Sequence, residues 1–164
     1  MEIQIRAYQT EHTQAILDVI NYNILHSTAL YDYKTRNYEQ QKAILEEKIK
    51  KGFPVLVAVR DGETVGFGMY SEFRFREAYK FTVEHSVYVS HNEIGNGIGK
   101  VLLSGLIQLA KAQGLHTMIG VIDSENQGSI IFHEQFGFKT VGIIKESGYK
   151  FDRWLDSVFM QLLL

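Results

Sequence analysis

VYVSHNEIGNGIGK, residues 87–100, is the stretch that decides the fold of this chain. Residues 87–89 have the composition of a strand, and a helical apolar pattern begins after Gly95, Gly97 and Gly99. Glycines let the backbone approach a ligand closely, and the first N–H groups of a helix have no intrahelical acceptor. The stretch therefore predicts a strand, a loop and a helix N-terminus that cradle a pyrophosphate. The alternative for a glycine turn of this kind is a purely structural role.

Two common phosphate-binding loops do not fit this stretch. A P-loop ends in Gly-Lys-Ser or Gly-Lys-Thr, whereas Gly99-Lys100 is followed by Val101. A dinucleotide-binding fingerprint requires the spacing G-x-G-x-x-G, whereas the spacing here is G-x-G-x-G. Asp123, at the end of the next predicted strand, does not restore that spacing. Both loop types are therefore excluded.

The glycine loop resembles that of the GNAT family, in which Gln/Arg-x-x-Gly-x-Gly/Ala binds the pyrophosphate of CoA. Residues 94–99 match at Gly97 and Gly99, and Ile94 stands where the family has Gln or Arg. A second family pattern, Asn-x-x-Ala-x-x-x-Tyr-x-x-x-Gly-Phe, follows about 30 residues later. This chain has its counterparts in order at Asn126, Ser129, His133, Gly137 and Phe138, with histidine in place of the usual tyrosine.

Two further runs resemble a bacterial subgroup, the phosphinothricin and methionine sulfoximine N-acetyltransferases. They are TVEHSVYVS, residues 82–90, and YKFDRWLDSVFMQL, residues 149–162. The resemblance implies direct transfer of the acetyl group of acetyl-CoA to the α-amino group of an amino-acid-like small molecule, in a homodimer without a metal ion. The cofactor-binding residues that it implies are Val87, Val89, Gly95, Asn96, Gly97, Ile98, Gly99, Lys100, Asn126 and Ser129.

The composition is that of one globular domain, predicted to span residues 1–164. Of the 164 residues, 45% are hydrophobic and 22% are charged, and the net charge of −2 disfavours a nucleic-acid partner. There is no cysteine, which excludes disulfides, thiolate metal sites and a cysteine nucleophile. No apolar run is long enough for a signal peptide or a membrane span, so we expect a cytoplasmic protein.

Periodicity predicts a mixed α/β or α+β layer domain with the element order β-α-α-β-β-β-α-β-α-β-β. The GNAT resemblance implies a central mixed, mostly antiparallel sheet of about seven strands flanked by about four helices. Thr10 is expected to cap the first helix near Glu11. The second helix, 38–51, is expected to place Ala43, Ile44 and Ile49 on one side. The predicted ranges are strands 3–8, 55–59, 64–70, 81–89, 118–122 and 157–163, and helices 11–24, 38–51 and 126–136, with another helix that ends near 114 and one strand after 138.

Glu84 is the leading candidate for the general base. Alternation along the strand puts Glu84, Ser86 and Tyr88 on one face and His85 on the other. Burial raises the pKa of a carboxyl group, which suits proton removal from an ammonium, either directly or through a water. The alternative is a solvated glutamate on a strand. In the family, a backbone N–H near Tyr88 polarises the thioester carbonyl, and Tyr88 joins Glu84 as a catalytic and substrate-binding residue.

The helix after residue 125 holds residues with two interpretations each. His133 either donates a proton to the CoA thiolate or makes a structural hydrogen bond. Asn126 caps the helix, binds the pantetheine arm, or does both through different atoms. Ser129 either allows the cofactor to pass closely or packs as an ordinary helix residue. His85, on the opposite strand face from Glu84, is expected to be structural.

The segment 72–80 is basic and aromatic. Arginine binds carboxylates or phosphinates through two parallel hydrogen bonds. In the resembled subgroup, a basic residue of this loop and an aromatic residue near position 79 hold the substrate. The resemblance therefore implies that Arg74 and Tyr79, with Arg76 as a further candidate, bind the acid group of the substrate, and a solvated basic loop is the alternative. Two alternative functions stay open for the protein. One is acetylation of a polyamine, aminoglycoside or protein amino group, and the other is that of a non-catalytic CoA-binding module. Trp154 is expected in the core or in a dimer interface.

Overall fold

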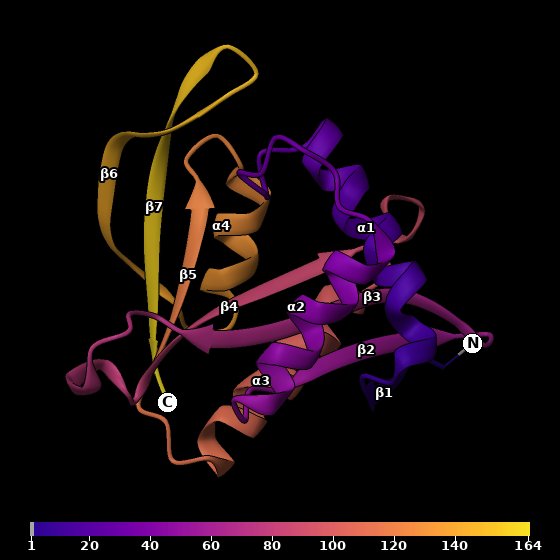
Figure 1. Ribbon diagram of the computed structural model, residues 1–164. Helices are drawn as coiled ribbons and strands as arrows, with labels where there is room; N and C mark the ends of the chain where they lie inside the picture. Colours follow the sequence, from indigo (N-terminus) through magenta and orange to yellow (C-terminus); the bar gives the residue numbers. More distant parts are fainter. Residues whose placement is uncertain (1) are drawn as a thin grey trace.

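The computed structural model describes residues 2–164 and contains a seven-stranded sheet in the order β1-β2-β3-β4-β5-β7-β6 (Figure 1). This confirms the mixed sheet, the helix number and the element order expected from the sequence. The strands are β1 (Gln4–Ala7), β2 (Val55–Arg60), β3 (Glu63–Glu72), β4 (Thr82–Val89), β5 (Thr117–Asp123), β6 (Lys139–Lys150) and β7 (Arg153–Leu163). The α-helices are α1 (Thr13–His26), α2 (Tyr38–Lys50), α3 (Ile98–Ala112) and α4 (Gln127–Glu134).

Helices cover both faces of the sheet and create two apolar layers. On one face, α1 and α2 pack against a cluster that includes Ile16, Leu45 and Phe67. On the other face, α3 packs against a cluster that includes Leu102 and Leu106. Burial of these side chains supplies the main driving force for folding.

Among the strands of residues 2–164, the pairing of β4 with β5 is the only parallel one, and it is short. Thr82–Glu84 pair with Thr117–Ile119, and the two strands then diverge (Figure 1). The edge of residues 85–89 that faces β5 therefore has no strand partner, although its other edge stays paired with β3. This wedge in the sheet positions the site described below.

The start of α1 differs from the expectation. Thr10 does not cap a helix; residues 10–12 form a short 3₁₀ turn, and α1 begins at Thr13. The backbone N–H of Gln9 donates to His12 Nδ1 at 2.8 Å, so a histidine three residues later takes over the capping interaction. A threonine side chain is only one of several groups that can cap the first turn of a helix.

The apolar side expected for α2 is not the side that this helix buries. Gln41 and Leu45 are fully buried, whereas Ala43 and Ile49 are exposed and Ile44 is half-buried. Tertiary packing rotates the helix so that a glutamine, whose Oε1 accepts from Arg36 at 3.0 Å, enters the core. The buried Nε2 of the same amide has no hydrogen-bond partner within the described residues, so only its oxygen is compensated, and periodicity alone could not reveal this arrangement.

The C-terminal hairpin removes one of the two alternatives for Trp154 and confirms another expectation. Trp154 is 63% exposed and lies against Tyr149, with ring centroids 4.9 Å apart, so it is not a core residue. The apolar strand β7 is paired on both sides, by β5 and β6, as its sequence requires. The two edge strands of the sheet are β1 and β6. Within the described residues, no helix is long and apolar enough to cross a membrane.

Candidate active site

A cavity of about 610 Å³ opens in the wedge between β4 and β5. Its walls come from four places: β4 itself, the glycine loop with the start of α3, the end of β5 with α4, and residues 28–31 after α1. We call residues 27–33 the strap, because they cross the open side of the wedge toward the tip of β5 (Figure 1). The cavity therefore joins segments from most of the chain.

The glycine loop has the geometry expected of an anion cradle. Gly95 and Gly97 have φ angles of 89° and 79°, in the left-handed region that favours glycine. A Cβ atom added at either position would meet nothing within 4 Å, so both glycines face open space. α3 begins at Ile98 without a side-chain cap, and residues 97–100 line the cavity. The orphan N–H groups and the helix dipole therefore favour negative charge here.

A carboxylate orders the start of this loop. Glu93 forms an ion pair with Arg60 of β2 and accepts a hydrogen bond from Asn96 Nδ2 at 2.9 Å. The pair holds the loop against the sheet and neutralises a negative charge that would otherwise repel an anion. Sequence reasoning missed both Arg60 and Glu93, because 33 residues separate them and neither belongs to a recognisable motif.

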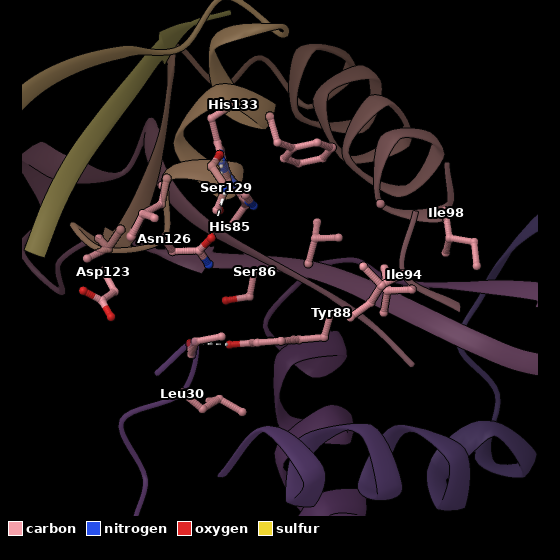
Figure 2. Close-up of a pocket in the computed structure, with 18 of the residues that line it drawn as sticks. Leu30, His85, Ser86, Tyr88, Ile94, Ile98, Asp123, Asn126, Ser129 and His133 are labelled. Atoms are coloured by element: carbon pink, nitrogen blue, oxygen red, sulfur yellow. Dashed lines mark hydrogen bonds between the residues drawn. The ribbon is translucent and has the colours of Figure 1, made fainter. Parts of the chain in front are cut away.

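The two faces of β4 carry different chemistry. The first, which we call the Glu84 face, also bears Ser86 and Tyr88, and Figure 2 shows Ser86 and Tyr88 on the side of Leu30. Burial raises the pKa of the half-buried Glu84, and the charge of Lys48 on α2 opposes this effect. Burial also raises the pKa of Tyr88 to about 12, so its hydroxyl stays protonated at neutral pH. That hydroxyl lies 3.5 Å from the carbonyl oxygen of Ala29.

The opposite face, which we call the His85 face, holds a pair of buried histidines. His85 Nε2 and His133 Nε2 are 3.0 Å apart, and His133 Nδ1 lies 2.6 Å from the carbonyl oxygen of Ser129 (Figure 2). The bond to the carbonyl places a proton on His133 Nδ1, so His133 Nε2 accepts from His85 Nε2–H. Burial, assisted by the charge of His133, lowers the pKa of His85 to about 3, and burial lowers that of His133. Both rings are therefore neutral at neutral pH.

The start of α4 shows the expected cap. Asn126 Oδ1 accepts from the backbone N–H of Ser129 at 3.1 Å, which confirms the capping interpretation of Asn126. Before it, Asp123 accepts from the backbone N–H of Glu125 at 3.1 Å and from the hydroxyl of Thr28 at 2.5 Å. The end of β5 is thus tied both to α4 and to the strap.

Residues 20–138 match the acetyltransferase (GNAT) family. The chain belongs to this family. It is 38% identical over 165 residues to an L-methionine sulfoximine/L-methionine sulfone acetyltransferase of Pseudomonas paraeruginosa, covering 100% of this chain and 96% of that relative. Family membership makes the protein an acetyl-CoA-dependent N-acetyltransferase.

Solved structures agree with this assignment. An N-acetyltransferase from Staphylococcus aureus Mu50 superposes with a TM-score of 0.98 at 39% identity, covering 99% of each chain. A GNAT superfamily phosphinothricin acetyltransferase from Sinorhizobium meliloti, in complex with AcCoA, has a TM-score of 0.96 at 34% identity, covering 100% of this chain and 89% of that chain.

The acetyltransferase has a cavity whose residues fit acetyl-CoA. The outward-facing glycine loop suits a diphosphate, and the unpaired edge of residues 85–89 offers backbone groups to the amides of a pantetheine arm. When bound, acetyl-CoA supplies a thioester, the activated form of the acetyl group. Within residues 2–164 no cluster of three or more His, Cys, Asp or Glu side chains is arranged to hold a metal ion.

Most predicted site residues of the acetyltransferase meet in the cavity. All of the predicted catalytic residues line it, and so do the predicted cofactor-binding residues apart from Asn96. Arg74, Arg76 and Tyr79 do not line it; they lie exposed on the loop between β3 and β4. There the Arg74 guanidinium lies 5.2 Å from the ring centroid of Phe73, and Tyr79 packs edge-on against the same ring.

Sequence reasoning missed one whole wall of the cavity. Residues 28–31 of the strap line it, and so does Phe132 of α4. The strap has no glycine pattern, no helical or strand period and no charge cluster that would mark it as part of a site. Its role follows only from contacts with residues about a hundred positions away, such as Thr28 with Asp123.

Proposed function

We propose that this acetyltransferase moves the acetyl group of acetyl-CoA directly to the α-amino group of an amino-acid-like small molecule of the phosphinothricin, methionine sulfoximine or methionine sulfone type. One observation carries the proposal. A single cavity joins a glycine loop built for an anion to a half-buried carboxyl with a raised pKa, Glu84. The acceptor class rests on the names of the relatives described above.

The cofactor belongs on the His85 face, beside the glycine loop. Backbone N–H groups of residues 95–100 hold the diphosphate, and the unpaired edge of β4 at Val87 and Val89 pairs with the pantetheine amides. Asn126 Oδ1 is engaged in capping, which leaves its Nδ2 to contact the pantetheine arm. A backbone N–H near Tyr88 polarises the thioester carbonyl, a contribution of about 3 kcal/mol in comparable sites.

The acceptor belongs on the Glu84 face, between β4 and the strap. Glu84 takes a proton from the acceptor ammonium, and the resulting neutral amine can attack the thioester carbonyl carbon. The raised pKa of Glu84 brings the carboxylate closer in basicity to the ammonium than an exposed glutamate would be.

The leaving thiolate needs a proton, and the two predicted donors differ. His133 is neutral, its Nδ1 proton goes to the Ser129 carbonyl, and its Nε2 accepts from His85. This arrangement favours the structural interpretation of His133. Tyr88 carries a proton at neutral pH and lines the cavity, so we assign the donor role to its hydroxyl.

The acid group of the acceptor extends toward the loop between β3 and β4. This loop is tied to the start of β4, where the Phe73 N–H donates to the Thr82 carbonyl at 3.3 Å, two residues before Glu84. In this proposal Arg74 and Tyr79, with Arg76 as a further candidate, contact the part of the acceptor that protrudes from the cavity.

We extend the proposal to the assembly and location of the protein. The chain acts as one domain over residues 1–164, in the cytoplasm, as a homodimer. Support for association comes from exposed apolar side chains on β6 and β7, including Val141, Ile143 and Trp154, which are 57%, 51% and 63% exposed. Burial of such side chains against a second copy would remove apolar surface from water.

Thiol release from acetyl-CoA tests the function. Methionine sulfoximine, methionine sulfone and phosphinothricin should each be tried as the acceptor, and we expect turnover with at least one. Release at the enzyme-free rate with all three, together with turnover of a polyamine, aminoglycoside or protein amino group, would reassign the acceptor. Binding of acetyl-CoA without turnover of any amine would indicate a non-catalytic CoA-binding module.

A further inference from the structure

The run YKFDRWLDSVFMQL contains a buried lysine that the proposed chemistry does not use. Lys150 ends the edge strand β6 and is 3% exposed, although most of that strand faces solvent. Gly148 is the other buried residue of β6. A lysine is almost never buried to this extent unless its ammonium has partners.

A break in strand pairing turns this end of β6 inward. The register with β7 shifts between Ile144 and Gly148, and Glu146 has a φ of 52°. Asp156 of β7 holds the bulge by accepting from the Glu146 backbone N–H at 2.8 Å. Between these pairs β6 advances by four residues and β7 by two, so two extra residues bulge out of β6 and bend the strand. Beyond the bulge, the Lys150 ammonium lies against the strap instead of in solvent.

The ammonium of Lys150 binds the strap backbone at two points. Nζ donates to the carbonyl oxygen of Ser27 at 2.6 Å and to that of Leu30 at 2.5 Å. Nζ also lies 5.0 Å from the ring centroid of Phe151. Burial lowers the pKa of Lys150, and the charge of Asp32 opposes this effect. Charged donors to backbone carbonyls make strong hydrogen bonds, so this lysine clamps one end of the strap.

Other contacts seat the strap on the same hairpin. Tyr31 packs so closely on β6 that a Cβ atom added at Gly148 would lie 2.6 Å from its Cε2. The Tyr33 hydroxyl donates to the Tyr149 carbonyl. Only a glycine at 148 leaves room for the Tyr31 ring, so the hairpin is shaped to receive the strap.

The other side of the strap forms part of the cavity. Residues 28–31 line it, and Leu30 lies across from Tyr88 in Figure 2. The Ala29 carbonyl faces the Tyr88 hydroxyl at 3.5 Å. A shift of the strap would therefore move the wall opposite the Glu84 face, while the glycine loop, on β4 and α3, would stay in place.

We propose that Lys150 is a positioning residue for acetyl transfer: its ammonium pins Ser27 and Leu30 to β6 and so holds strap residues 28–31 as the wall of the acceptor side. This inference rests on the proposed function, because it takes the Glu84 face to be the acceptor side. It predicts that loss of the Lys150 ammonium raises the KM for the acceptor and not the KM for acetyl-CoA, since Lys150 touches neither the reacting groups nor the cofactor side.

Lys150→Met tests the inference, since methionine keeps most of the length and removes the donors. We expect the acceptor KM to rise about tenfold or more, because two charge-assisted hydrogen bonds are lost. The KM for acetyl-CoA should stay within about twofold, because misplacement affects only groups that the wall positions. Lys139→Met, at an exposed lysine of the same strand, is the matched control and should leave both KM values unchanged.

Equal changes in both KM values, or wild-type kinetics in Lys150→Met, would overturn the inference. Gly148→Ala gives an independent route if Lys150→Met does not fold. The added methyl group displaces the Tyr31 ring and should reproduce the selective rise in acceptor KM. Unchanged acceptor KM in a folded Gly148→Ala protein would also count against the role of the strap.

Hydrogen exchange separates this inference from the proposed function. Failure of the proposed function appears in the wild-type protein, as absent thiol release with the three amino-acid analogues. The amides of residues 28–33 can still be followed in that case, and Lys150→Met should exchange them faster than wild type while α3 stays protected. Identical exchange in the two proteins would show that Lys150 does not hold the strap.

Discussion

Glu84 and His85 are neighbours in sequence, yet they lie on opposite faces of β4 and have different proposed roles, general base and structural residue. Burial shifts both toward the neutral form, raising the pKa of Glu84 and lowering that of His85 to about 3. Both residues line the cavity, but the Nε2 of His85 is already bonded to His133. The comparison shows that desolvation alone does not create a catalytic group. The group also needs an atom that is not committed to another side chain.

Glu84→Gln should have the largest effect on the reaction. Removing a general base typically lowers kcat by about 100- to 10,000-fold, while acetyl-CoA binding should stay near wild type. Thiol release measures kcat, and calorimetric titration measures the binding of acetyl-CoA. Glu63→Gln, at an exposed glutamate of β3, serves as the control. In the wild type, kcat/KM should fall as the pH falls through the raised pKa of Glu84, because protonation removes the base. A wild-type rate in Glu84→Gln would remove Glu84 from the mechanism.

His85→Leu should alter stability more than chemistry. In the unfolded chain, the His85 imidazole takes up a proton near its ordinary pKa. In the folded protein, burial lowers this pKa to about 3, so the imidazole stays neutral at any pH above that value. The wild-type free energy of unfolding should therefore fall with decreasing pH in that window, by about 1.4 kcal/mol per pH unit from this group. Urea titrations at several pH values should show a shallower slope in His85→Leu. His26→Gln, at an exposed histidine, should keep the wild-type slope, and an equally steep slope in His85→Leu would contradict the buried neutral pair.

Gly97→Ala should weaken the cofactor side without touching the Glu84 face. A left-handed conformation costs a non-glycine residue about 1–2 kcal/mol, and the new methyl group points into the open cradle. We expect the KM for acetyl-CoA to rise about tenfold and the acceptor KM to stay unchanged. Gly52→Ala provides a matched control, because Gly52 has a φ of 86° and lies after α2, away from the cavity. If both variants gave the same kinetics, the glycine loop would not be a cofactor site.

Arg74→Ala should have the smallest effect of the four. Arg74 is exposed and lies outside the cavity lining, so any contact with the acceptor is screened by solvent. We expect the acceptor KM to rise by less than about tenfold, and only for acceptors that carry an acid group. A comparison of methionine sulfoximine with its decarboxylated amine measures this selectivity. Equal changes with both amines would show that Arg74 does not bind the acid group.

The sequence by itself determined the parts of this protein that depend on neighbouring residues. The element order, the position of the glycine loop and the alternation of Glu84 and His85 across β4 were all predicted and are all present. Glycines and strand periodicity act over a few residues, so their consequences can be read without a fold. The GNAT resemblance rests on motifs of the same local kind.

The tertiary structure alone decided which distant segments complete the cavity. The wedge between β4 and β5, the rotation of α2 and the clamp of Lys150 on the strap have no local signature. Lys150 and Ser27 are 123 positions apart, and they meet only in the folded protein, where Lys150 lies beyond the bulge in β6. Such contacts depend on the packing of whole elements, and no short-range pattern in the chain encodes that packing.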